Sequence, residues 1–209
     1  MMQPLSLPPA LEQFERIERL GVRQRVEMAE VALGIERRNR YTIEDSRNGV
    51  RLTSQELSGG LLGILLRQFL KGARPFRMEV RDENERLLLR FRRPFRFFFY
   101  RLEVSDPDGR LLGVVRRRFT LIRRRYTIEN AGGMELAELF GPFFKPWTFE
   151  IRVRGEQRGL IRKQWSGLTK EVLTQADNFQ VEFHPTLDQR LRPLCLGATF
   201  LIDYAHFER

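Results

Sequence analysis

Residues 190–209 read RLRPLCLGATFLIDYAHFER, and this last stretch decides the fold of the chain. No residue from 193 to 202 is charged, and Leu194, Phe200 and Ile202 point to different sides of a helix. A helix that is apolar all round belongs inside a protein core or a bilayer.

The length of this stretch distinguishes the two environments. Its ten uncharged residues, at about 1.5 Å each, give roughly 15 Å, half of a hydrocarbon core of about 30 Å. Asp203 follows directly, and placing it within the bilayer costs about 2.5–3.5 kcal/mol. We therefore predict a central helix at about 190–207 that is buried in protein, rather than a short membrane anchor.

The composition indicates a folded domain with an anionic partner. Of the 209 residues, 42% are hydrophobic and 31% are charged, as in globular proteins. Cys195 is the single cysteine, so no intrachain disulfide is expected, and the first residues lack the pattern of a secretory signal. The net charge of +10 comes almost entirely from arginine, whose planar fork suits phosphate on lipids or nucleic acids. A GC-rich genome is the alternative source of the arginines.

The N-terminal region shows helical spacing. Residues 1–9 are rich in proline, and Leu11, Phe14, Ile17 and Leu20 then predict an amphipathic helix that ends near Gly21. A second helical pattern covers 26–33. We assign residues 1–36 to an N-terminal segment that packs on the domain, and residues 37–209 to the domain itself.

From residue 40 onward the hydrophobic period is two, which indicates strands. The predicted hairpins pair 41–43 with 50–52, 76–80 with 87–91, 100–104 with 112–114, 126–128 with 134–139, and 149–153 with 160–163. A short helix at 168–176 and a last strand at 179–183 precede the terminal helix. Such evenly spaced hairpins favour a mainly β, closed or nearly closed antiparallel meander around that helix.

Several short motifs resemble one family. The segments KQWSGL (163–168), TQADNF (174–179) and LGATFLID (196–203) are similar to the C-terminal signature of the phospholipid scramblase family. PPALE (8–12), NRYTI (39–43) and RPF (74–76) are similar to it in the same order. This resemblance implies a Tubby-like closed antiparallel twelve-stranded β-barrel around a central C-terminal helix. It also implies calcium-linked, bidirectional movement of phospholipids at the cytoplasmic face of the plasma (inner) membrane.

The sequence departs from the animal members of that family at three loops. Those members carry cysteine clusters for palmitoylation there, whereas this chain has aliphatic and aromatic residues beside cations at 61–71, 93–101 and 140–147. We hypothesise that the three loops gather at one end of the barrel and dock on an anionic phospholipid membrane. The alternative is that some of these side chains face the core or a partner subunit. The expected membrane contacts are Leu62, Leu65, Leu66, Phe69, Phe97, Phe98, Phe99, Phe143, Phe144 and Trp147.

Arginines near these loops are candidates for phosphate binding, with a solvated strand face as the alternative. They are Arg67, Arg96, Arg101, Arg116, Arg117, Arg118, Arg123, Arg124 and Arg125. Nucleic acid is a less favoured partner, because aromatic residues lie apart from the arginine triplets instead of between them.

The resemblance also implies calcium near residue 177. The candidate ligands are Asp177, Asn178, Glu182 and Asp188, while Gln175 stands where the family has an acid. Calcium takes six to eight oxygen ligands, so these residues form a sparse set. A helix cap or turn at 177–178 is the alternative.

No catalytic constellation is found, so we predict a protein that is not an enzyme. His184 and His206 lack metal-ligand spacing, and Ser166 lacks a nucleophile elbow. Moving a headgroup through hydrocarbon requires a polar path that this chain does not provide with a spanning helix. Lipid movement would therefore need a homo-oligomer or a thinned bilayer. The second candidate is a lipid-binding or protein-interaction module without transport.

Overall fold

The computed structural model describes residues 7–25, 40–45, 47–57, 75–95, 100–120, 124–164 and 178–206. These residues form a 3-10 helix, twelve strands and one α-helix. In chain order they are η1 (Pro9–Arg16), β1 (Arg19–Arg25), β2 (Arg40–Asp45), β3 (Val50–Glu56), β4 (Phe76–Asp82), β5 (Leu87–Arg93), β6 (Arg101–Ser105), β7 (Leu111–Arg118), β8 (Arg124–Asn130), β9 (Glu135–Gly141), β10 (Thr148–Val153), β11 (Glu156–Gln164), β12 (Asn178–Phe183) and α3 (Leu191–His206).

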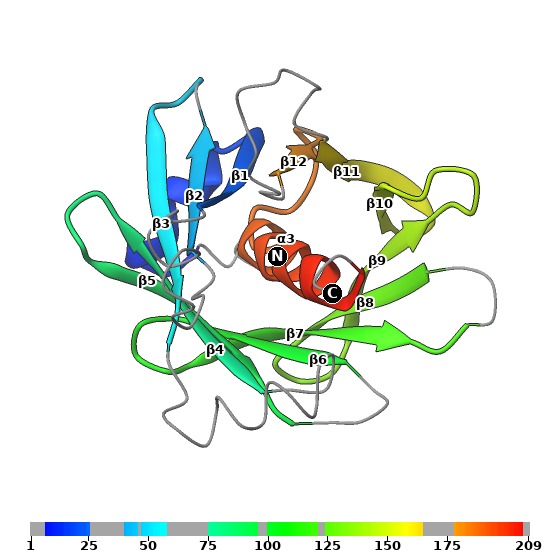
Figure 1. Ribbon diagram of the computed structural model, residues 1–209, viewed down its shortest axis with the longest axis horizontal. Coiled ribbons are helices and arrows are strands. Elements are labelled where there is room, and N and C mark those ends of the chain that lie inside the picture. The colour runs from blue at the N-terminus through cyan, green and yellow to red at the C-terminus, as the bar shows by residue number, and fades with distance from the viewer. Residues whose placement is uncertain are drawn as a thin grey trace, which may run out of the picture.

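The strands form a closed antiparallel barrel with α3 inside it (Figure 1). Each strand pairs with its neighbours in sequence, and β1 closes the barrel on β12, where Leu20 lies opposite Val181. Along β4 buried residues alternate with more exposed ones, so one face of the strand contributes to the core. The predicted hairpins and the closed twelve-stranded barrel around the terminal helix are therefore confirmed.

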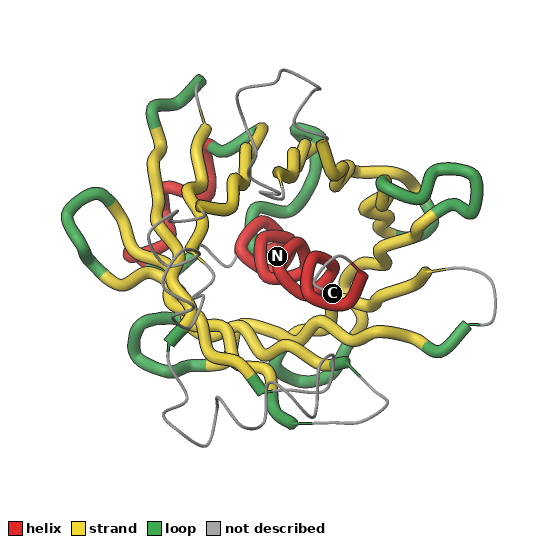
Figure 2. The backbone as a smooth tube through the Cα atoms, viewed as in Figure 1, coloured by secondary structure: helices red, strands yellow, loops and turns green. Residues whose placement is uncertain are grey.

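The central helix is buried along nearly its whole length. Every residue from Leu191 to Tyr204 is buried, and the tube in Figure 2 shows the helix enclosed by strands. Phe200 packs against the rings of Tyr41 and Phe91, at centroid distances of 4.8 and 5.5 Å. At Gly197 an added Cβ would lie 3.0 Å from side-chain atoms of Phe91 and Val104, so a glycine allows the helix to approach the wall.

The few polar groups on the buried helix have specific partners. The Tyr41 hydroxyl donates to Asp203 Oδ2 at 2.7 Å, and the Thr199 hydroxyl donates to the Cys195 carbonyl at 3.0 Å. Arg192 Nη1 donates to the Phe14 carbonyl at 2.8 Å and thereby ties α3 to η1. Burial raises the pKa of the Cys195 thiol to about 12, so this cysteine is an unreactive core residue.

The N-terminal prediction is wrong in one respect. The helix expected from Leu11 to Leu20 ends at Arg16 as a 3-10 helix, and Arg19–Arg25 is a barrel strand within the segment assigned to helices. Apolar residues three apart also suit a 3-10 helix, which has three residues per turn. The helices predicted at 26–33 and 168–176 lie outside the described residues.

The meander gives the barrel two different ends. At one end tight turns join β4 to β5, β6 to β7, β8 to β9 and β10 to β11. At the other end β3, β5, β7 and β9 stop and β4, β6, β8 and β10 begin, and we call this the long-loop end. The last turn of α3 lies here, since the Tyr204 ring is 5.2 Å from that of Phe76 at the start of β4.

Candidate functional site

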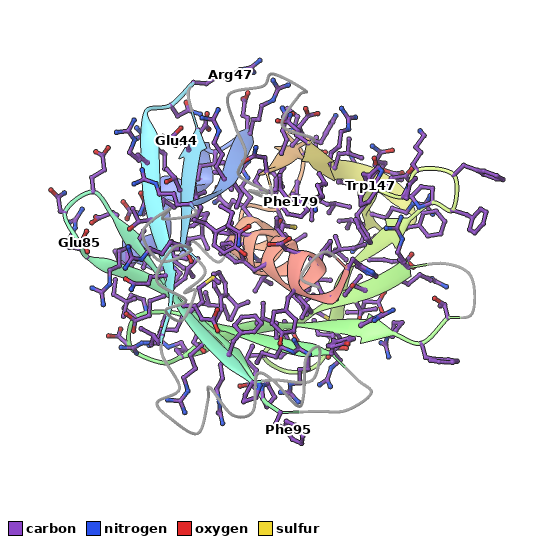
Figure 3. All side chains as sticks on the ribbon, viewed as in Figure 1. Glu44, Arg47, Glu85, Phe95, Trp147 and Phe179 are labelled. Atoms are coloured by element: carbon purple, nitrogen blue, oxygen red, sulfur yellow. The ribbon has the colours of Figure 1, made fainter. Side chains whose placement is uncertain are left out.

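Exposed hydrophobic side chains gather at the long-loop end. Six of the seven large ones that are exposed in the described ranges lie there, and the seventh, Met134, lies in a turn at the opposite end. We call the six the apolar rim: Leu57 after β3, Phe95 after β5, Phe119 after β7, and Phe143, Phe144 and Trp147 between β9 and β10. Figure 3 shows Phe95 and Trp147 at separate points of the circumference.

The exposure of these rings is too large to be explained by packing within the chain. Phe119 is 83% and Phe144 is 91% exposed. Single exposed hydrophobic residues are ordinary on protein surfaces, but a group at one end marks an interaction surface. The rim therefore presents apolar groups at the surface and is a candidate interaction site.

Cations accompany the apolar rim. Lys145 lies within it, and the ammonium group of Lys163 is 5.8 Å from the centre of the Trp147 ring. Arg124 donates to the carbonyl of Lys145 at 3.2 Å and to that of Pro146, so it holds the segment between β9 and β10 in place. Apolar and aromatic groups beside cations are the combination that suits a membrane interface.

The rim includes every predicted membrane contact that the structure describes, namely Phe143, Phe144 and Trp147. The other seven, at residues 62, 65, 66, 69 and 97–99, lie outside the described residues. The strands that border the three predicted loops do share the long-loop end. The predicted contacts omitted Leu57, Phe95 and Phe119, although Phe95 lies within the predicted loop 93–101. The available signal at Phe119 was an aromatic residue directly after a strand and between two arginine triplets.

Four of the six predicted phosphate-binding arginines that the structure describes lie on the outer wall and pair with carboxylates. Arg116 Nε is 2.7 Å from Glu129, Arg118 Nη2 is 3.7 Å from both Glu129 and Glu135, Arg101 Nη2 is 3.0 Å from Glu103, and Arg125 contacts Glu138. These pairs fit the solvated strand face that was the alternative. Arg67, Arg96 and Arg123 lie outside the described residues.

Arg117 and Arg124 differ because they lie near the end of the buried helix. The guanidinium of Arg117 is 5.2 Å from the Tyr100 ring centre, and that of Arg124 is 4.7 Å from the Phe149 ring centre. Arg93, only 2% exposed, lies 4.1 Å from the Tyr204 ring centre. Cations at a helix C-terminus interact favourably with the helix dipole, so these arginines stabilise the last turn of α3.

His206 ends this helix and has an unusual protonation equilibrium. Burial, together with the charges of Arg117 and Arg124, lowers its pKa to about 4. Its Nε2 is hydrogen-bonded to the Tyr126 hydroxyl at 2.7 Å, and burial raises the pKa of that tyrosine. Both side chains are therefore neutral at pH 7.

We expect His206 to make folding weaker in mild acid. Its pKa is lower in the folded than in the unfolded state, so the unfolded chain binds the proton first and stability falls as pH decreases from about 6.5 towards 4. Between pH 7 and pH 5 this loss amounts to about 2 kcal/mol. Urea denaturation of the wild type and of H206Q checks it, because the variant should lose less stability over that interval. Parallel pH curves would contradict the assignment.

The described calcium candidates do not converge on one point. Asn178 and Glu182 lie four residues apart on β12, a separation of about 13 Å along a strand, whereas ligands of one calcium ion lie within about 2.6 Å of it. Glu182 is 3.3 Å from Arg19, and Asp188 accepts from Arg190 Nε at 3.0 Å. Asp177 lies outside the described residues, which contain no group of three or more His, Cys, Asp or Glu residues suited to a metal.

No helix in the described ranges is both long and apolar enough to cross a bilayer.

The family model described as Scramblase matches residues 1–209. The chain is 30% identical to phospholipid scramblase 1 of Mus musculus over 99% of its own length and 66% of the mouse protein. It is likewise 30% identical to phospholipid scramblase 2 of Bos taurus, over 99% of this chain and 74% of that one.

Another relative, phospholipid scramblase family member 5 of Homo sapiens, is 29% identical over 98% of this chain and 79% of its own. The chain spans slightly less than two thirds of phospholipid scramblase 1 from mouse and rat, at 66% and 64%. A comparison with solved structures finds no match.

Proposed function

Because the chain belongs to the scramblase family, we propose that it docks on anionic phospholipid membranes and moves phospholipids between the two leaflets. Docking uses the long-loop end, and the membrane surface is the cytoplasmic face of the plasma (inner) membrane. The apolar rim with its cations is the observation that carries this proposal.

The physical chemistry of the rim supports docking. Phenylalanine and leucine side chains gain free energy at the acyl boundary, Trp147 suits the headgroup depth, and Lys145 and Lys163 suit phosphate. The net charge of +10 attracts the chain to an anionic leaflet. Apolar insertion and electrostatic attraction together supply the two contributions that stable peripheral binding needs.

Movement of lipids requires more than one docked molecule. The barrel is filled by α3, so a headgroup cannot pass through its interior. A polar path must then form between several copies of the chain or where docked copies thin the bilayer. We accordingly propose a homo-oligomer at the membrane as the active form.

A dithionite-quenching assay in proteoliposomes with a fluorescent phospholipid tests the proposal. The wild-type chain should allow quenching of inner-leaflet lipid that protein-free vesicles protect. The M134S variant, altered at the opposite end of the barrel, is the matched control and should match the wild type. If the inner-leaflet lipid stays protected from dithionite at high protein density, the transport proposal is wrong.

A calcium arm of the same assay tests the link that the resemblance implies. The described candidates Glu182 and Asp188 pair with arginines, which leaves Asp177 as the candidate ligand that this arm concerns most. Quenching at millimolar calcium is compared with quenching in a chelator. Faster quenching with calcium would support calcium-dependent lipid movement, and Asp177 would be the first candidate ligand to substitute.

The second candidate function is a lipid-binding or protein-interaction module without transport. The filled barrel favours it, because α3 and the buried side chains around it occupy the core. The two candidates differ in one result. A chain that binds vesicles fully but leaves inner-leaflet lipid protected is a binding module.

A further inference from the structure

A cavity of about 510 Å³ lies on the outer wall of the barrel. Residues of β4, β5 and β6 line it together with Gly109 and Leu111, and it reaches Leu57 of the apolar rim at one end. The charged side chains among them are Arg77, Glu79, Arg90, Arg92 and Glu103. We call this cavity the wall groove, and it shares only Leu57 with the apolar rim.

Strand register arranges the charges of the wall groove in two rows. In the row nearer the long-loop end, Arg77 on β4 lies opposite Arg92 on β5, and Arg92 lies opposite Glu103 on β6. In the next row Glu79 lies opposite Arg90. Two cations thus lie side by side just below the rim, with a carboxylate on the neighbouring strand and another one row further along β4.

The arginine pair is unfavourable without an anion. Like charges at directly opposite cross-strand positions destabilise a sheet. Arg118 and Arg125 also lie opposite each other, but Arg125 contacts Glu138 directly and Arg118 is 3.7 Å from two carboxylates, whereas the Arg77–Arg92 pair has one distant carboxylate neighbour. Arg77 makes no side-chain ion pair or hydrogen bond in the described part of the chain, and Arg92 Nη1 is 3.8 Å from Glu103, too far for a hydrogen bond. Both guanidinium groups can therefore donate to a phosphate.

Two glutamates place negative charge beside this anion site. Each already pairs with arginine, since Glu79 is 2.6 Å from Arg81 Nη2 and 3.6 Å from Arg90 Nε, and Glu103 is 3.0 Å from Arg101 Nη2. A carboxylate has about four lone-pair sites, so each can accept a further hydrogen bond. Their side chains are half-enclosed, with exposures of 17% for Glu79 and 23% for Glu103.

Glu103 lies one strand away from Arg92, and its carboxylate is 3.8 Å from Arg92 Nη1, so a phosphate bound to Arg92 and an ammonium group bound to Glu103 would be close neighbours, as they are in a zwitterionic headgroup. A carboxylate accepts hydrogen bonds from a primary ammonium, which a quaternary ammonium cannot donate.

We propose that the wall groove binds the phosphoethanolamine headgroup of a phospholipid. Arg77 and Arg92 bind its phosphate, and Glu103 and Glu79 bind its ammonium group. Leu57 lies beside Arg77, whose carbonyl accepts from the Leu57 backbone amide at 2.8 Å, so the glycerol end of the lipid faces the apolar rim. This site would select the lipid class that the proposed function moves, and its biological role rests on that function. Binding of the headgroup itself requires no membrane and can be measured separately.

Calorimetric titration of the full chain with soluble glycerophosphoethanolamine tests this site. We expect saturable binding that R77Q/R92Q weakens at least ten-fold, because each arginine contributes charge-assisted hydrogen bonds. R23Q/R51Q removes two exposed arginines from the walls at β1 and β3 and is the matched control, which should bind like the wild type. Equal weakening by both double variants would overturn the site, since only general charge would then matter.

Further titrants separate the headgroup from a simple anion. Glycerol phosphate and inorganic phosphate should bind at least five-fold more weakly than glycerophosphoethanolamine, and E79Q/E103Q should remove that preference. Phosphate bound as tightly as the full headgroup analogue would overturn the assignment. Melting temperatures of all variants confirm that they are folded, and R77Q/R92Q should melt no lower than the wild type, because it removes a like-charge pair.

Vesicles containing phosphatidylethanolamine distinguish failure of this site from failure of the proposed function. R77Q/R92Q should still dock on anionic vesicles but lose the gain in binding that phosphatidylethanolamine gives. Rim variants should fail to dock and still bind the soluble headgroup. A wild-type chain that docks and shows no preference for phosphatidylethanolamine would reject the wall-groove proposal and leave docking intact.

Discussion

Replacing Phe200 with alanine is expected to lower the free energy of unfolding by about 3–5 kcal/mol, the usual loss for a large aromatic ring removed from a packed core. The ring is 2% exposed and lies between Tyr41 of β2 and Phe91 of β5. The helix residue therefore contacts two strands of the barrel wall that are not neighbours, since β3 and β4 lie between them. Denaturant unfolding followed by circular dichroism measures the effect.

The same truncation at an exposed phenylalanine provides the control. F119A removes a ring that is 83% exposed, so its effect should remain within about 0.5 kcal/mol. A loss below about 1 kcal/mol for F200A would mean that the central helix does not hold the strands together. The architecture from which the rim and the wall groove follow would then be wrong.

The central helix and the hairpins could be predicted because their signals are local. An uncharged run that ends at Asp203 fixes both the burial and the length of α3. Alternation with period two is visible within each strand, and turns rich in glycine, asparagine and aspartate separate the strands. Neither signal requires knowledge of distant contacts.

The first strand could not be predicted in the same way. In β1 the buried residues are Leu20 and Val22, which are too few to establish a period of two. Its pairing with β12 joins Leu20 to Val181 across almost the whole chain. The strand thus depends on a non-local contact, and the regular spacing of Leu11, Phe14 and Ile17 before it favoured a helix.

The candidate site was partly accessible from sequence. Phe143, Phe144 and Trp147 form a recognisable cluster, whereas Leu57, Phe95 and Phe119 are single residues after different strands. Only the order of strands around the barrel shows that these ends lie together. The division of the arginine triplet 116–118 between the two faces follows from alternation with Val115, which is fully buried.

The wall groove was not accessible from sequence, because it depends on register. Arg77 faces Arg92 only because a bulge between Val80 and Arg81 sets the pairing of β4 with β5. A slip of one residue would move side chains to the opposite face of the strand. Turn geometry and bulges of this kind are not visible in the hydrophobic pattern.

Removing the exposed phenylalanines of the rim is expected to weaken membrane docking at least 100-fold. In F119S/F143S/F144S three rings that are 83%, 64% and 91% exposed are lost. Full burial of such a ring is worth about 1.5–3 kcal/mol, so partial insertion of all three contributes about 3 kcal/mol, which is roughly 100-fold in affinity. Flotation with anionic vesicles measures the loss.

The outcome is informative because the folded chain gains nothing from exposed rings. The melting temperature of the triple variant should match that of the wild type, and M134S, which removes an exposed apolar group from the other end, should float normally. Higher salt should weaken binding of every variant, because the cations act through a screened potential. If the triple variant floats as well as the wild type at both salt concentrations, the long-loop end does not face the membrane, and the lipid must be sought on another surface of the barrel.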